Sequence, residues 1–219
     1  ITDPKSLTQV QGSIEAKGGA TGGNGGRIET SGAGLEVDGI TVNASAEDGD
    51  NGLWLLDPVN IEIVSDSVSA DDNAFVTEDL IGDGEGEVGR AALSGCFLPC
   101  FEYDGDGGNP LDVTLRASSI VKALDAGSDV AVLTDSYALG VNDPGGDGTI
   151  TVNAPIVAAA DTGSGLSLEA NSDIIVNERI EVDGYLQLYS GAEDVNINVN
   201  APLLSKSSHT SLQAPEGFI

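Results

Sequence analysis

A short phrase returns along the chain at nearly constant intervals, and this repetition restricts the fold more than any other feature of the sequence. Its three late copies are ITVNAPI (150–156), IIVNERI (174–180) and INVNAPL (197–203), whose starting residues lie 24 and 23 positions apart. An earlier copy, ITVNASA, occupies 40–46. Apolar and polar residues alternate within each copy, which is the pattern of a half-buried β-strand.

The repeat predicts an all-β fold. Further alternating runs lie between the late copies and after them, at 166–170, 186–189 and 212–214. A period of this length is too short for a propeller blade, and the sequence is too poor in helix formers for a helical solenoid. We therefore expect a parallel β-helix in which each repeat forms one coil. About ten coils at a spacing of about 4.8 Å would give a rod on the order of 45 to 50 Å long.

Stacked coils place equivalent residues of the phrase in columns. The inward columns that we expect are Ile150, Ile174 and Ile197, and Val152, Val176 and Val199. The residues that end the phrase form a third column, Asn153, Asn177 and Asn200. These asparagines would form a hydrogen-bonded ladder between coils. The alternative is that each asparagine only favours the turn in which it lies.

The repeat is interrupted between residues 65 and 112. This segment carries 12 acidic residues against one base, Arg90, and contains both cysteines. Insertions into repeats map to loops on one face of a solenoid. We therefore expect coils at 1–64, an acidic insertion at 65–112 and coils at 113–219, all in one continuous solenoid domain. A smaller insertion covers 136–148.

The two cysteines, Cys96 and Cys100, have three residues between them. Two cysteines do not complete a four-ligand zinc site, and the redox motif CxxC has only two intervening residues. We expect a disulfide that closes a small loop, a bond that would persist in an extracellular compartment.

The chain is strongly acidic, with 8 Lys+Arg against 36 Asp+Glu and a net charge of −28. This charge disfavours nucleic acids and anionic membrane surfaces as partners, and no apolar run is long enough for membrane insertion. The metal that remains as a candidate is calcium, bound weakly at Asp104 and Asp106, although the closing Glu of an EF-hand is missing. The alternative is a solvated acidic face that keeps long rods apart.

Carboxylate pairs also suggest catalysis, because polysaccharide lyases and hydrolases use β-helical scaffolds and paired acids. The pairs here are Asp71 with Asp72 and Asp104 with Asp106. Basic residues for charge stabilisation are scarce near them, and His209 has no evident nucleophile motif. We therefore expect no catalytic residues and no enzymatic activity.

Three local features have structural interpretations. The glycine-rich stretch 18–26 lacks the GxxxxGK[ST] pattern of a phosphate loop, so we expect tight corners there. Trp54, in the sequence WLLDP, is expected to cover the core rather than to bind a ligand. The segment 119–126 predicts a short helix that a serine caps.

GGNGGRIETSG (22–32), followed by GLWLLDP (52–58) and NIEI (60–63), resembles the filamentous-haemagglutinin-like exoproteins of bacterial two-partner secretion. ASSIVKALDAG (117–127) and DVAV (129–132) extend the resemblance over most of the chain. The resemblance implies a right-handed β-helix, export through an outer-membrane partner pore, and an adhesive or filamentous role at the cell surface.

The secretion-recognition domain of that family is not evident, and the chain contains no Met and opens on ITDPKSLTQV. We therefore expect a shaft segment of a larger secreted protein, with a host, surface or neighbouring-cell receptor as its partner and self-association into filaments left open. Two other functions remain as alternatives: a polysaccharide-acting enzyme, and a ligand-capture passenger such as a haem carrier.

Overall fold

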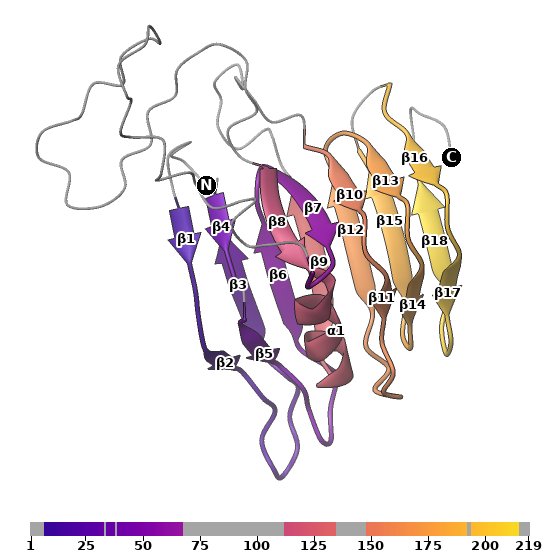
Figure 1. The fold of residues 1–219 in the computed structure, drawn as a ribbon. Helices are drawn as coiled ribbons and strands as arrows, with labels where there is room; N and C mark the ends of the chain where they lie inside the picture. The colour runs from indigo at the N-terminus through magenta and orange to yellow at the C-terminus, as the bar shows by residue number, and fades with distance from the viewer. Residues whose placement is uncertain are drawn as a thin grey trace, which may run out of the picture.

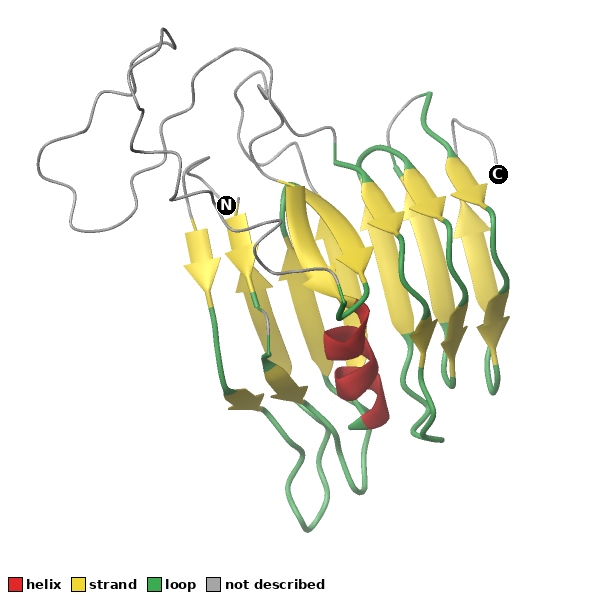
Figure 2. Cartoon of the chain, viewed as in Figure 1, coloured by secondary structure: helices red, strands yellow, loops and turns green. Residues whose placement is uncertain are grey.

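The computed structural model describes residues 7–32, 34–37, 39–67, 112–134, 148–191 and 194–214. Their strands wind into a parallel β-solenoid with three faces (Figure 1), and a single helix lies among the strands (Figure 2). The strands of each face pair in parallel with the equivalent strands of neighbouring coils. The predicted all-β parallel solenoid with a short helix is therefore confirmed.

The three faces are defined by their strands in spatial order. The first face consists of β1 (Leu7–Gln9), β4 (Gly34–Glu36), β8 (Asp112–Arg116), β7 (Asn60–Val64), β10 (Ile150–Val152), β13 (Ile174–Val176) and β16 (Ile197–Val199). The second face consists of β2 (Ser13–Glu15), β5 (Thr41–Asn43), helix α1 (Ala117–Asp125), β11 (Ile156–Val157), β14 (Ile180–Val182) and β17 (Leu203–Ser205). The third face consists of β3 (Arg27–Ser31), β6 (Leu53–Asp57), β9 (Asp129–Thr134), β12 (Leu166–Ala170), β15 (Leu186–Ser190) and β18 (Thr210–Gln213).

The interior is a continuous apolar core made of the predicted columns. Ile150 pairs with Ile174, and Ile174 pairs with Ile197, in the register of the first face. The same register aligns the three valines of the phrase and extends both columns to β7 and β8, where Ile61 and Val113 occupy the isoleucine column. Inward-facing side chains therefore stack at the strand spacing of about 4.8 Å through the molecule.

The described residues form six coils rather than about ten, because the third face has six strands. The sequence-based estimate of ten coils came from dividing the length of the whole chain by the spacing of the late copies of the phrase. Residues 68–111 lie outside the described chain, and the first coils are longer than that period, with 26 residues between the starts of β3 and β6 (27 and 53).

The chain steps backwards along the solenoid at the acidic segment. β7 precedes the segment and β8 follows it, yet the spatial order on the first face is β16, β13, β10, β7, β8. β8 thus lies between β4 and β7, and β10 later stacks on the other side of β7. The acidic segment therefore begins at one level of the solenoid and ends one level closer to the N-terminus.

Helix α1 replaces a strand on the second face, where it contacts both β5 and β11 (Figure 1). A helix is about 10 Å wide, about twice the spacing of strands. The first face has two strands, β8 and β7, at this level, whereas the third face has only β9 between β6 and β12. At this level the first and second faces are therefore longer along the solenoid axis than the third face, by one strand spacing.

The helix begins at Ala117, immediately after β8, so the predicted serine cap is wrong. Arg116 is the N-cap residue and makes no capping hydrogen bond with its side chain, while Ser119 lies buried inside the helix. Ile120, Ala123 and Leu124 are fully buried against the core. Packing of this apolar side holds the helix in place, because nine residues alone are too few for a stable helix in water.

The earlier copy of the phrase does not join the late copies. It forms β5, which pairs with β2 on the second face. Its asparagine, Asn43, accepts hydrogen bonds from the backbone N–H and the hydroxyl of Ser45, at 3.0 and 2.7 Å. At this position the asparagine supports a turn and takes no part in a ladder.

Glycines form the first corners, as predicted. A Cβ on Gly25 would collide with the carbonyl oxygen of Ala44, and one on Gly52 would collide with that of Gly26. Trp54 is fully buried in the core, and its indole N–H donates to Thr30 Oγ1 at 3.1 Å.

Candidate functional site

The asparagines of the phrase are joined by side-chain hydrogen bonds along one corner of the solenoid. Asn200 Nδ2 donates to Asn177 Oδ1 at 2.8 Å, and Asn177 Nδ2 donates to Asn153 Oδ1 at 2.8 Å. Asn153 Nδ2 donates to Glu62 Oε1 at 2.6 Å. The three asparagines are exposed, so each bond stabilises the fold by only about 1 kcal/mol.

This asparagine ladder has a direction, because every amide donates toward the N-terminal end. It ends there on the Glu62 carboxylate of β7, which can only accept. The phrase does not contain this glutamate, so repeat analysis missed it. Knowledge that β10 stacks on β7 would have found it, since Glu62 pairs with Thr151 in that register.

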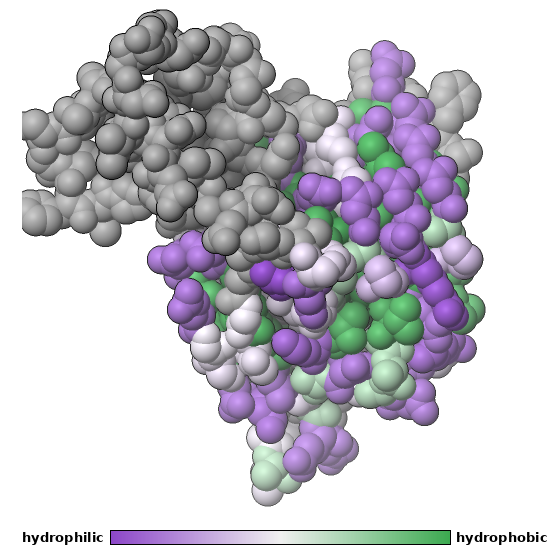
Figure 3. All heavy atoms as spheres, in the orientation of Figure 1, coloured by the Kyte–Doolittle hydropathy of each residue, from purple (hydrophilic) through white to green (hydrophobic). Residues whose placement is uncertain are grey.

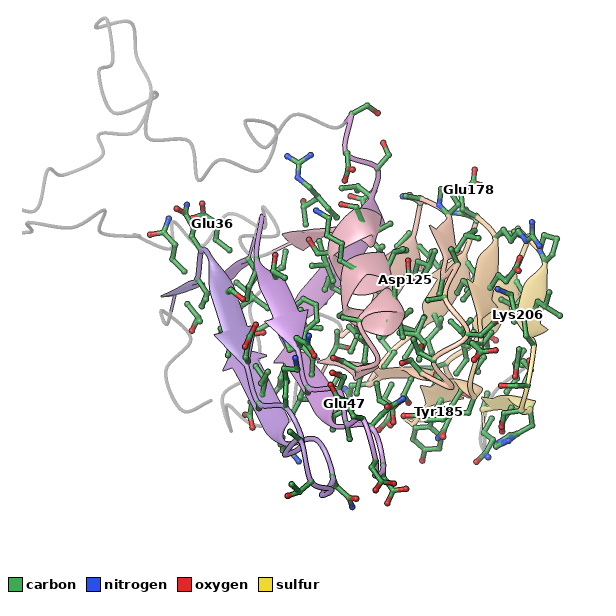
Figure 4. The ribbon with its side chains drawn as sticks, turned by 90° about the horizontal axis from the view of Figure 1, so that it is seen from below. Glu36, Glu47, Asp125, Glu178, Tyr185 and Lys206 are labelled. Atoms are coloured by element: carbon green, nitrogen blue, oxygen red, sulfur yellow. The ribbon has the colours of Figure 1, made fainter. Side chains whose placement is uncertain are left out.

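A second polar cluster fixes the corner at the end of α1. The Asp125 carboxylate accepts hydrogen bonds from the backbone N–H groups of Ala159 and Ala160, at 2.8 and 2.9 Å. Thr162 Oγ1 donates to the carbonyl of Leu124, and Asn51 Nδ2 donates to the carbonyl of Thr162. Asp125 is the last residue of α1 and is labelled at the helix in Figure 4. These bonds tie the turn after β11 to α1, which is a structural role.

The outer surface of the third face carries a group of aromatic and polar side chains. We call this group the tyrosine surface; its members are Asp129, Ser167, Glu169, Tyr185, Gln187 and Tyr189. They come from β9, β12 and β15, except Tyr185, which immediately precedes β15, and they lie next to one another in the parallel register, with Ser167 buried. Figure 4 shows Tyr185 pointing away from the solenoid. Tyrosines that expose a ring and a hydroxyl are common in protein interfaces, so this is a candidate contact surface.

Tyr185 is held in place by a glycine that immediately precedes the neighbouring strand, β12. A Cβ on Gly165 would collide with the Tyr185 ring, so the ring lies directly against the backbone there. Burial, together with the negative charges of Asp129 and Glu169, raises the pKa of Tyr185 to about 12. The phenol is therefore a neutral hydrogen-bond donor at physiological pH.

Burial also raises the pKa of Asp129, and the hydrogen bond from the backbone N–H of Gly165, at 2.9 Å, opposes this shift. The remaining acid of the surface, Glu169, accepts a hydrogen bond from Ser167 Oγ at 2.9 Å. Sequence alternation predicts outward positions for Gln187 and Tyr189. It did not identify Tyr185, which precedes the strand.

The second face presents charged and apolar side chains together. Glu181 forms ion pairs with Arg179 and with Lys206, the latter at 3.3 Å. Its neighbours in the outward column, Val157 and Leu204, are 38% and 43% exposed. Figure 3 shows hydrophobic residues near the centre of this view and a mostly hydrophilic rim. Exposed ion pairs contribute little to stability, at most about 1 kcal/mol each.

The described chain includes the base of the acidic segment. Arg116 donates to the carbonyl of Asp66 at 2.8 Å, and Ser118 Oγ donates to the Asp66 carboxylate at 2.6 Å. These bonds fasten the chain that leaves β7 to the junction of β8 and α1.

Most of the site residues predicted from the sequence lie outside the described residues. These are the cysteines Cys96 and Cys100, the calcium candidates Asp104 and Asp106, and the acids Asp71 and Asp72. The disulfide and the calcium site stay predictions. His209 is exposed, and its Nδ1 lies 3.1 Å from Ser208 Oγ.

Within the described ranges no group of three or more His, Cys, Asp or Glu side chains could hold a metal ion. No described helix has the length and apolar character to cross a membrane. In the comparisons with known proteins, no family model matches the chain, and no curated protein is significantly similar to it.

Proposed function

We propose that the chain is a structural and adhesive segment of a large secreted bacterial surface protein, exported by two-partner secretion. The observation that carries the proposal is the continuity of the solenoid around the acidic segment. β8, β7 and β10 stack as neighbours although 47 residues, 65–111, separate β7 from β8. A regular scaffold from which a long segment emerges suits a shaft that presents a recognition element, because loops carry binding while the scaffold carries stability.

Secretion and surface location belong to the same proposal and rest on the family resemblance. Two features agree with them. Each coil contacts mainly its neighbours, so a solenoid can fold progressively as it emerges from a pore. The net charge of −28 keeps long rods soluble and separate outside the cell.

The test compares adhesion of the parent chain with that of a linker variant. In this variant residues 69–110 are replaced by 12 Gly/Ser residues, and Asp66 keeps its contacts with Arg116 and Ser118. Beads coated with either protein are applied to epithelial cells, to bacteria and to extracellular-matrix proteins. We expect the parent to adhere and the variant to lose most of that adhesion while keeping its β-type circular dichroism spectrum.

Three results would contradict this proposal in whole or in part. A parent chain that adheres to none of these surfaces would remove the adhesive function. Turnover of a polysaccharide by the parent, abolished by Asp71→Asn or Asp104→Asn, would instead assign the chain to the enzymes. A linker variant that adheres as well as the parent would move recognition to the solenoid, where the tyrosine surface is the first candidate.

A further inference from the structure

The tyrosine surface lies on a lateral face of the solenoid, where the stacking of coils does not cover it. β15 pairs with β12 on one side and with β18 on the other. Leu186 and Leu188 are fully buried in the core. Tyr185, Gln187 and Tyr189 alternate with them and are partly exposed on the outside. Further coils at either end of the solenoid would leave these side chains on the same outer face.

Tyr185 supplies an aromatic ring whose position is fixed by the fold. A Cβ on Gly165 would collide with three atoms of the ring, so the ring lies against bare backbone. The side chain nevertheless points away from the solenoid (Figure 4). An aromatic ring that is already ordered loses little conformational entropy when a ligand binds, and its face can pack against C–H groups.

Hydrogen-bonding groups of both kinds surround this ring. The hydroxyls of Tyr185 and Tyr189 and the side-chain amide of Gln187 make no hydrogen bond within the described chain. Each of these groups can both donate and accept. Carboxylates, which only accept, lie beside them. Glu169 is paired with Tyr189 in the register of β12 and β15, and the charges of Asp129 and Glu169 contribute to the raised pKa of Tyr185.

This mixture of groups restricts the chemistry of a ligand. The strands β9, β12, β15 and β18 contain no Lys or Arg, so an anionic ligand would meet carboxylates with no cation to compensate them. A cation could interact with the ring and the carboxylates, but ammonium and guanidinium groups only donate. It would leave the free N–H donors of Gln187 without an acceptor. The fitting ligand is uncharged and carries both donors and acceptors.

The position on the face of a sheet argues against an extended peptide as this ligand. Peptides that bind through their backbone add a strand to a free sheet edge. Both edges of β15 are already occupied, by β12 and β18. A sugar ring, in contrast, presents C–H groups on its faces and hydroxyls at its rim. These groups match an exposed tyrosine ring surrounded by amide, hydroxyl and carboxylate groups.

We propose that the tyrosine surface binds a neutral saccharide. C–H groups of a sugar ring pack against Tyr185, and the sugar hydroxyls exchange hydrogen bonds with Gln187 and with the Glu169 carboxylate. From Tyr185 to Tyr189 the strand extends about 13 Å, which about two or three linked pyranose rings would cover. The site is separate from the acidic segment and does not depend on the adhesive function proposed for that segment.

Isothermal titration calorimetry of the whole chain tests the ligand class. The neutral probes are the β-1,4-linked hexasaccharides of glucose, mannose and N-acetylglucosamine. Hexagalacturonic acid is the anionic comparison and hexalysine the cationic one. We expect at least one neutral probe to bind with a Kd that is the same at low and high salt, because an uncharged ligand has no charge for salt to screen. Hexagalacturonic acid should not bind.

Substitutions on β15 and in front of it test the location. Tyr185→Ala removes the ring and should weaken saccharide binding about tenfold or more. Tyr185→Phe keeps the ring and should weaken binding less. Gln187→Ala removes the amide and should weaken binding about three- to tenfold. Asn198→Ala is the matched control, since Asn198 carries an exposed amide on the first face; it should bind like the parent.

Circular dichroism and thermal unfolding show whether each variant is folded. If Tyr185→Ala is not, Tyr185→Phe and Gln187→Ala carry the test, because both keep the ring that packs on Gly165. The linker variant lacks residues 69–110 and keeps the tyrosine surface, so it should bind the saccharide as the parent does. A linker variant that loses saccharide binding would place the site in the acidic segment instead.

Three further results would overturn the proposal. The first is a parent chain that binds none of the neutral probes. The second is saccharide binding that is equally strong in the parent, in Tyr185→Ala and in Gln187→Ala, which would locate the sugar elsewhere. The third is tight binding of hexalysine at high salt that Tyr185→Ala abolishes, without binding of a neutral probe. That result would make the surface a cation site.

Discussion

Two kinds of residue recur from coil to coil, and they act on stability in different ways. Val176 is fully buried between the valines of the coils on either side. Asn177, its neighbour, is exposed and joins the same two coils through its amide. Burial of a valine contributes more than an exposed hydrogen bond, because water satisfies the asparagine when the ladder is broken.

Val176→Ala should therefore destabilise the protein by about 2 to 3 kcal/mol, and Asn177→Ala by about 1 kcal/mol. For a chain of this size these values correspond to decreases in Tm of about 4 to 12 °C and about 2 to 4 °C. Thermal unfolding followed by circular dichroism provides the measurement. Asn198→Ala, at an exposed position outside the ladder, is the control and should change Tm least. A larger effect for Asn177 than for Val176 would contradict this ranking.

The raised pKa of Tyr185 predicts a specific loss of stability in alkali. Since its pKa is about 12 in the folded chain and about 10 when unfolded, the folded state holds the proton more tightly. Stability from this group is complete below pH 10 and is lost as the pH rises toward 12. Absorbance titration should show a late tyrosinate phase that Tyr185→Phe removes.

Asp129→Asn should move this late phase to lower pH, because it removes a negative charge beside the phenol and keeps an oxygen that can accept from Gly165. Glu62→Gln, on the first face, is the control and should leave the phase unchanged. Titration of all tyrosines in one phase near pH 10 would show that Tyr185 is not buried as described.

At the scale of elements, the backward step from β7 to β8 determines how the chain tolerates deletion. Parallel neighbours need a connection that returns from the end of one strand to the start of the next. From Val64 to Asp112 this return is about 14 Å, namely about 13 Å along the strand and about 4.8 Å across it. The acidic segment therefore has a structural duty as a connection, whatever it binds.

Direct deletion of residues 66–110 should consequently disrupt the fold. The three Cα–Cα steps that would remain between Val64 and Asp112 span at most about 11 Å, which is too short. The 12-residue linker of the linker variant has a root-mean-square end-to-end distance of about 19 Å, which is enough to cover the return. The linker variant should therefore unfold at nearly the same temperature as the parent. Thermal melts of both proteins make the comparison. A direct deletion as stable as the linker variant would argue against the observed order of β7 and β8.

The same elements mark what the sequence could predict. Columns such as that of Ile150, Ile174 and Ile197 were predictable, because alternation specifies the inward side and the period specifies the neighbour. The reversed order of β7 and β8 was not, because the phrase is absent from both strands. The tyrosine surface was only half predictable, since Tyr185 owes its position to contact with Gly165 from another coil.

At the scale of the whole molecule, the six described coils form one scaffold, because residues from every coil pack in the same apolar core. The residues that carry the family resemblance, in GGNGGRIETSG and GLWLLDP, have structural roles here. They form glycine corners and include the buried Trp54. Residues that pack against the next coil are constrained by geometry. Outward columns, in contrast, can hold dissimilar residues, such as Val157, Glu181 and Leu204, so their binding properties depend on contacts that the repeat does not encode.

Helix α1 covers the core of the solenoid and also affects the direction of the solenoid axis. At the level of α1, two faces are longer along the solenoid axis than the third, by one strand spacing. The coils before and after this level are therefore not expected to share one straight axis. An excess of one strand spacing, about 4.8 Å, on one side of a coil is expected to turn the axis toward the other side. At this level the side formed by the first and second faces is longer along the axis than the third face, and the acidic segment leaves from the first face. In a longer shaft the described strands that flank that segment, β7 and β8, would lie on the outer side of a curve.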